Sequence, residues 1–213
     1  MSEPTSSNPS LSDTIGDFAE LVAAGTPTPG GGSVAAYCGV LAASLGRMMC
    51  NITIGKPKYA AVEERLGEIA EELGRLSARL RESISEDAAS FEAVLRAYRM
   101  PKDTEDQKAQ RAAEIQTALQ AAVDVPFETG QLSFYVLKLL CEVAEIGTPS
   151  VLSDVAMGAQ LAQVAIRGAS YNVIVNLDSL SDRDAAEKKR REIDSLVHQA
   201  ATLADYVAAK MKT

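Results

Sequence analysis

Apolar residues recur through most of the chain at intervals of three and four positions, which is the period of a helix that buries one face. The longest such stripe lies within residues 58–98 and consists of Val62, Leu66, Ile69, Leu73, Leu76, Leu80, Ile84, Phe91, Val94 and Tyr98. A helix of this length would extend about 60 Å, which is longer than one small bundle covers. We therefore expect an elongated bundle with one very long helix, and a homodimer in which a second copy covers the overhanging stripe.

Five further helices are expected from the same period and from breaks at proline and glycine. They span about residues 11–24, 33–53, 104–147, 151–177 and 181–211, with Ser33 as N-cap of the second and a capping box of Thr104 and Gln107 in the third. Pro126 is expected to kink this third helix or to start a new one. Because no repeat or linker intervenes, residues 11–213 should form one domain behind a disordered lead-in of residues 1–10.

Composition supports this all-α class and excludes several functions. Ala, Leu, Glu, Arg and Lys dominate a chain with 46% hydrophobic and only 5% aromatic residues. The formal net charge of −8 argues against a surface for nucleic acid or anionic membranes. The N-terminus lacks the features of a signal peptide, and the longest apolar stretch, Val34 to Gly46, is too short to span a bilayer. A cytoplasmic protein without membrane contact is therefore expected.

Metal and thiol chemistry find little support in the sequence. The three cysteines, Cys38, Cys50 and Cys141, fit no zinc spacing and stand among apolar neighbours, which indicates buried reduced thiols. The single histidine, His198, falls opposite the apolar stripe of the last helix and is expected on the surface. Neither a metal site nor a Ser-His-Asp triad is expected, so acid–base work falls to Asp, Glu, Lys or Tyr.

A proline- and glycine-rich loop, "TPTPGGGS" at residues 26–33, leads directly into an apolar helix. It is not a phosphate-binding loop of the Walker type, because Gly31 and Gly32 stand where Lys and Ser or Thr must follow. Glycines before a helix expose backbone N–H groups, and the helix dipole there favours a carboxylate or phosphate. The loop is thus a candidate ligand site, and the alternative is a plain interhelical turn, for which one glycine would be enough.

Asp87 is the sharper candidate, because it occupies a position of the long helix where the neighbouring stripe residues are apolar. A carboxyl at this position is desolvated unless it is paired. Its pKa should therefore rise unless a cation or hydrogen-bond donors hold it ionised. Carboxyls with a raised pKa are candidates for proton transfer. A structural buried ion pair, or exposure where the helix overhangs its bundle, is the alternative.

A stripe of small residues in the helix of residues 151–177 starts at Asp154 and ends at Asn172 and Asn176. Small residues allow another helix to approach closely, so the polar ends would be buried and need partners, as recognition of a planar, amide-rich heterocycle requires. Taken alone, Asp154 is better explained as a helix N-terminal acid. The cations Lys56, Lys58 and Lys102 stand at helix breaks, where a ligand site between helices would place them.

Five motifs in order resemble the formiminotransferase-cyclodeaminase C-terminal family over about residues 12–210: "PTPGGGSVAA", "CNITIGKPKY", "EDAASFEAV", "MPKDTEDQKAQRAAEIQ" and "LSDVAMGAQLAQVAIRGASYNVIVNL". The resemblance implies an all-α homodimer with a folate site between helices at or near the dimer interface. Stand-alone members act as methenyltetrahydrofolate cyclohydrolases or formimidoyltetrahydrofolate cyclodeaminases. The resemblance implies a tetrahydrofolate one-carbon derivative as the substrate, with or without a polyglutamate tail. It implies no separate cofactor and no metal.

Carried over by position, the resemblance implies catalytic roles for Asp87 and Lys56. It implies substrate-binding roles for Thr28, Gly30, Gly31, Gly32, Ser33, Lys58, Lys102, Asp154, Asn172 and Asn176. We expect Asp154 to meet the pterin ring, the lysines the glutamate tail, and Asp87 with Lys56 the one-carbon bridge. Pro57 departs from the basic or polar residue expected between the two lysines.

Cyclohydrolase activity is the first hypothesis, because without a formiminotransferase half the chain has no supply of the formimino substrate of its own. The alternatives are a cyclodeaminase that releases ammonia and a non-catalytic helical dimer that binds folate.

Overall fold

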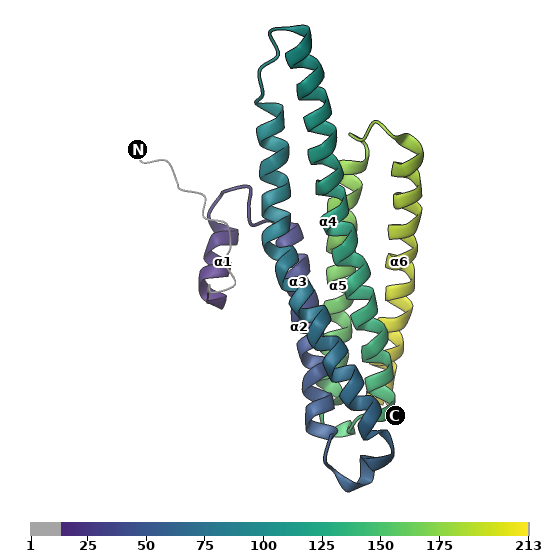
Figure 1. The fold of residues 1–213 in the computed structure, drawn as a ribbon. Coiled ribbons are helices and arrows are strands. Elements are labelled where there is room, and N and C mark those ends of the chain that lie inside the picture. Colours follow the sequence, from purple (N-terminus) through teal and green to yellow (C-terminus); the bar gives the residue numbers. More distant parts are fainter. Residues whose placement is uncertain (1–13, 213) are drawn as a thin grey trace.

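Helical segments follow one another along almost the whole of the structure, a computed structural model that describes residues 14–212 (Figure 1). The α-helices are α1 (Ile15–Ala23), α2 (Gly31–Thr53), α3 (Glu63–Tyr98), α4 (Glu105–Ile146), α5 (Leu152–Leu177) and α6 (Arg183–Ala209). Three short 3-10 segments, Pro57–Val62, Pro149–Val151 and Lys210–Lys212, join or end them. Residues 14–212 contain no strand, which confirms the all-α prediction, while the expected lead-in of residues 1–10 lies outside this range.

Two helices, rather than one, are very long. α3 has 36 residues and α4 has 42, and together they project beyond the other helices at one end of the elongated bundle (Figure 1). The expectation of a single long helix is wrong because α4 continues through Pro126. Since α4 lies beside α3, most of the apolar stripe of α3 is covered within the chain, and only Phe91 and Tyr98 remain 40% and 48% exposed.

Helix α2 is the central element of one half of the bundle, where it packs against α3, α4 and α5. Its approach to α5 is close, because a Cβ on Gly158 would lie 3.4 Å from the Ala42 carbonyl oxygen and one on Gly168 would lie 3.0 Å from the Ala35 Cβ. The close approach predicted for the small-residue stripe is thereby confirmed. By length and composition α2 could cross a membrane, whereas the stretch Val34 to Gly46 alone was expected to be too short. However, 56% of the most apolar part of α2 is buried inside the bundle, as in the core helix of a globular protein.

Helix α1 lies beside the bundle and contributes no buried residue (Figure 1). Its expected apolar stripe is only partly covered: Ile15 is 74% exposed, whereas the ring of Phe18 lies 5.4 Å from that of Tyr37 on α2. The capping box predicted for Thr104 and Gln107 at the start of α4 is confirmed.

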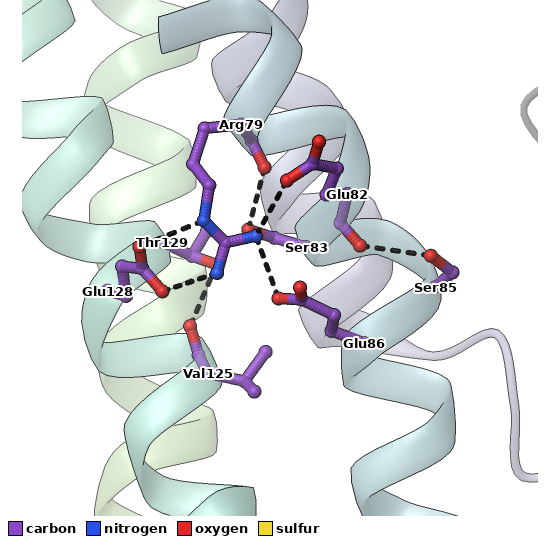
Figure 2. A network of polar contacts seen from close by, with 8 residues as sticks. All are labelled: Arg79, Glu82, Ser83, Ser85, Glu86, Val125, Glu128 and Thr129. Carbon is purple, nitrogen blue, oxygen red and sulfur yellow. Dashed lines mark hydrogen bonds and ion pairs between the residues drawn. The ribbon is translucent and has the colours of Figure 1, made fainter.

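An arginine on α3 ties α3 to α4 in the middle of the bundle (Figure 2). The guanidinium of Arg79 donates to both carboxylate oxygens of Glu128 on α4, at 3.0 and 2.6 Å, and to Glu86 on α3 at 2.9 Å. Glu82 lies 3.5 Å from the same guanidinium, whose side chain is 30% exposed. Because a bidentate arginine–carboxylate pair fixes both distance and angle, it sets the register between the two long helices.

Candidate functional site

The bundle contains a pocket at the level where α2 begins. One core cluster draws on α2 to α6, and a second cluster further along the bundle contains residues of α3 to α6 but none of α2. Between them, where α2 starts at Gly31, a cavity of about 150 Å³ opens between α3, α4 and α5. Its lining consists of Pro27, Thr28, Gly30, Gly31, Gly32, Asp87, Ser90, Phe91, Ala122, Asn172 and Asn176.

The glycine loop packs closely against the carboxylate of Asp87 on α3. A Cβ on Gly32 would lie 2.8 Å from Oδ2 of Asp87 and nearer still to Oδ1. Gly31, in contrast, is exposed, and a Cβ there would lie at an ordinary 3.7 Å from Nδ2 of Asn172. Glycine at position 32 is therefore required for the approach of α3 to the first turn of α2.

Ser33 does not cap α2, contrary to the prediction. The N-cap is Gly30, three residues earlier, and it makes no side-chain capping bond. The Ser33 hydroxyl instead lies 2.9 Å from Oδ2 of Asp87 and 3.1 Å from the Ile84 carbonyl oxygen, and its backbone N–H also donates to Asp87. The carboxylate from α3 thus supplies the acceptor that an N-cap side chain would otherwise provide, so the glycines can join the helix.

Burial raises the pKa of the Asp87 carboxyl above its usual range, and the hydrogen bonds from Ser33 lower it by a smaller amount. This direction confirms the prediction made from the apolar stripe. Among residues 14–212 no basic side chain forms an ion pair with Asp87. Asp87 is also the one titratable group in the described lining of the pocket. A carboxyl in this setting is a stronger base than an exposed aspartate and can also carry a proton.

Two amides from α5 complete the polar wall. Asn172 donates through Nδ2 to the Gly168 carbonyl at 2.9 Å. Asn176 donates through Nδ2 to the carbonyl oxygens of Asn172, at 2.9 Å, and Ala122, at 3.2 Å. Because both N–H groups of Asn176 are engaged, its remaining hydrogen-bonding atom is the acceptor Oδ1.

The structure brings seven of the expected site residues together and leaves the others apart. The lining includes Thr28, Gly30, Gly31, Gly32, Asp87, Asn172 and Asn176. Ser33 lies behind it against Asp87.

The remaining expected residues lie near the ends of the bundle. Lys56 and Lys58 lie in the connection between α2 and α3, and Asp154 lies in the first turn of α5. Since α3 rises about 1.5 Å per residue, Asp87 is roughly 36 Å from that end of the helix. Lys102 lies beyond the opposite end of α3, in the turn before α4. Within one chain, Lys56 therefore does not meet Asp87.

Sequence reasoning missed Ser90, Phe91 and Ala122. Ser90 and Phe91 follow Asp87 by three and four positions, so they share its helix face, and that spacing could have identified them. The only signal for Ala122 is Pro126, four residues further along, whose missing N–H frees the Ala122 carbonyl.

The histidine and Cys50 lie as the sequence predicted, whereas Cys38 and Cys141 are less buried than expected, and none of the four lines the pocket. Cys50 is buried, Cys38 and Cys141 are half-buried, and all three are free. Burial raises the pKa of all three thiols, that of Cys50 to about 11. His198 is exposed on α6.

Known proteins share the sequence pattern and the fold. The family described as Formiminotransferase-cyclodeaminase matches residues 14–195. A methenyltetrahydrofolate cyclohydrolase of Methylorubrum extorquens is 39% identical over 201 residues, which are 94% of this chain and 97% of that protein. The formimidoyltransferase-cyclodeaminase of Mus musculus is 32% identical over 95% of this chain, which spans 38% of that longer protein. The crystal structure of a formiminotetrahydrofolate cyclodeaminase from Thermotoga maritima superposes with a TM-score of 0.83 at 26% identity, covering 95% of this chain and 98% of that one.

Proposed function

Since the chain belongs to the formiminotransferase-cyclodeaminase family, we propose that it hydrolyses 5,10-methenyltetrahydrofolate to 10-formyltetrahydrofolate. The observation that carries the proposal is Asp87, a half-buried carboxyl with a raised pKa that faces a pocket at a helix N-terminus. The cyclohydrolase from Methylorubrum extorquens matches nearly end to end, which favours this activity over the alternatives.

In the proposed reaction a water molecule attacks the bridging carbon of the substrate and gives one proton to Asp87. The bond from that carbon to N5 then breaks, its electron pair stays on N5, and Asp87 returns the proton to N5. The second proton of the water is released to solvent as the formyl C=O forms. The attack needs a proton acceptor, and the cleavage of the bond to N5 needs a proton donor. One carboxyl with a raised pKa fills both roles in turn. The cationic bridge itself favours the ionised form of Asp87 before attack.

The first turn of α2 offers donors for the oxygen that develops charge. Backbone N–H groups in a first turn have no acceptor within their helix, and Gly31 and Gly32 both line the pocket. Donors already fixed in place stabilise a developing oxyanion without reorganising. The acceptor Oδ1 of Asn176 suits an N–H of the pterin ring. The reaction as proposed uses no metal and no cofactor other than the folate itself, and the cytoplasmic location remains a prediction.

A second copy of the chain is proposed to complete the site. Pockets for molecules of drug size enclose about 300–1,000 Å³, so a cavity of about 150 Å³ cannot enclose a whole folate. On α5 the exposed residues Met157, Val164 and Tyr171 recur every seven positions and continue to Val175, with exposed fractions of 55%, 56%, 63% and 69%. Tyr171 directly precedes the pocket residue Asn172, so a partner on this face would border the pocket. Such a partner could also bring Lys56, Lys58, Lys102 or Asp154 to the ligand.

Cyclodeaminase activity is the second candidate, supported by the relatives and the structure that carry this name. There N10 attacks the formimino carbon and ammonia leaves, so the same carboxyl would move the protons.

Two parallel assays with the purified chain test the proposal. We expect loss of the methenyl absorbance with formation of 10-formyltetrahydrofolate, faster than ammonia is released from the 5-formimino compound. Faster ammonia release would identify a cyclodeaminase. Folate binding without either reaction would identify a non-catalytic binding protein and overturn the proposal.

A further inference from the structure

A proline inside α4 leaves a free carbonyl at the pocket. Pro126 has no backbone N–H, so the carbonyl of Ala122, four residues earlier, lacks the donor that a helix normally supplies. Nδ2 of Asn176 on α5 donates to this carbonyl at 3.2 Å. Ala122 and Asn176 both line the pocket, while Pro126 is buried one turn further along α4.

This contact decides which end of the Asn176 amide faces a ligand. The amide also donates to the Asn172 carbonyl at 2.9 Å, so two backbone oxygens surround the same atom. Carbonyl oxygens only accept hydrogen bonds, so the atom between them is the amide nitrogen. Oδ1 is the remaining hydrogen-bonding atom of the side chain, and it is an acceptor.

We propose that Pro126 is a positioning residue for substrate recognition, which acts by freeing the Ala122 carbonyl to hold the Asn176 amide with Oδ1 available to the ligand. Any other residue at position 126 brings an N–H that bonds to the Ala122 carbonyl within α4. A carbonyl can accept two hydrogen bonds, but without the proline ring, which crowds the carbonyl four residues earlier, this one turns back toward its own helix and away from Asn176. The amide then keeps one anchor, on its own helix, and is free to rotate. The group selected by Oδ1 is an N–H donor, such as the amino group or ring N–H of a pterin. This inference rests on the proposed function for the identity of the ligand.

The Pro126→Ala variant separates this role from a purely structural one. Alanine restores a helical hydrogen bond and has a higher helix propensity, so the melting temperature should be unchanged or higher. KM for the folate substrate should rise about ten-fold, the scale of one lost hydrogen bond, with a smaller change in kcat. Val125→Ala changes the adjacent position of α4, leaves the proline in place, and should keep the wild-type KM. An unchanged KM in Pro126→Ala would overturn the proposal.

A double-mutant cycle tests whether Pro126 acts through Asn176. In the Asn176→Ala background, Pro126→Ala should cause no further rise in KM. The same rise in both backgrounds would show that the proline acts by another route and would refute the proposal.

A ligand-free measurement separates failure of this inference from failure of the proposed function. By NMR, the side-chain amide protons of Asn176 should exchange with solvent about ten-fold faster in Pro126→Ala than in the wild type, because one of two hydrogen bonds is lost. Unchanged exchange would overturn the positioning role even if the enzyme turns over methenyltetrahydrofolate. Faster exchange in a chain that turns over no folate would support the role and reject only the proposed substrate.

Discussion

Among the glycines that line the pocket, Gly32 is the one that tolerates a side chain least. Gly32→Ala would force the Asp87 carboxyl away from the first turn of α2, and overpacking of this kind costs about 1–3 kcal/mol. We expect both a lower melting temperature and a strong loss of kcat. Gly31→Ala is the matched control, because its Cβ meets Asn172 at an ordinary distance. It should keep the melting temperature and at most raise KM, and equal stability losses in the two variants would contradict this view of the loop.

The raised pKa of Asp87 predicts how stability depends on pH. Below the pKa of an unfolded aspartate, ordinarily 3.8, both the folded and the unfolded chain hold the proton, and burial of the carboxyl carries no charge penalty. As the pH rises through the higher pKa of the folded protein, stability is lost because the partly desolvated carboxyl must ionise. Asparagine stays neutral at every pH. The melting temperature of Asp87→Asn relative to the wild type should therefore increase from acid to neutral pH, and thermal melts that show a constant or falling difference would contradict the desolvation argument.

At this scale the sequence was informative where a polar residue interrupts a regular pattern. Asp87 was identifiable because its neighbours on the stripe are apolar, and its burial and pKa shift follow from that position. The true partner of Ser33 was not predictable, because a capping residue and a residue that binds a carboxyl from another helix have the same local sequence. The lysines at the helix breaks were grouped with Asp87 because of the family resemblance. The local sequence pattern does not show that a long stretch of helix separates them from Asp87 within one chain.

Among the helices, the contact between α3 and α4 depends on Arg79. Arg79→Gln would leave Glu82, Glu86 and Glu128 close together without their shared cation. Because the pair with Glu128 is bidentate and the arginine is only partly exposed, we expect a loss of about 1–2 kcal/mol, more than the usual surface ion pair contributes. Arg75→Gln, one turn earlier on α3, removes an exposed pair at 3.9 Å from Glu71 and should cost less than about 0.5 kcal/mol. Urea unfolding of both variants measures the difference, and equal losses would show that the network is unimportant.

The helices themselves were largely predictable, because periodicity and breaks at proline and glycine mark them. In α4 the sequence left open whether Pro126 kinks the helix or starts a new one, and the structure shows that no new helix starts there. A proline inside a helix is tolerated when another group satisfies the carbonyl it frees, and here that group is Asn176, 50 positions away in the sequence. No local pattern contains that information. Consequently, the sequence overestimated how much of α3 overhangs the bundle.

For the whole molecule, the prediction of a homodimer now rests on α5 rather than α3. A charge in the exposed apolar stripe of α5 should disrupt association, because a buried unpaired carboxylate is costly. We expect the wild type to sediment as a dimer at micromolar concentration and Val164→Glu to sediment as a monomer with little activity. Gln131→Glu introduces the same group at an exposed position of α4 and should remain dimeric. A fully active wild-type monomer would contradict the composite site.

Turnover of 5,10-methenyltetrahydrofolate by the wild type and by Asp87→Asn tests the central claim most directly. Asparagine keeps the shape of the side chain but cannot accept the proton, so kcat should fall at least about 100-fold, the scale of a positioned acid–base group, in a variant that melts as a folded protein. The decay of the methenyl absorbance, corrected for the uncatalysed reaction, measures this loss. An unchanged kcat in folded Asp87→Asn would contradict the account, because this half-buried carboxyl beside the start of α2 would then be only a structural cap.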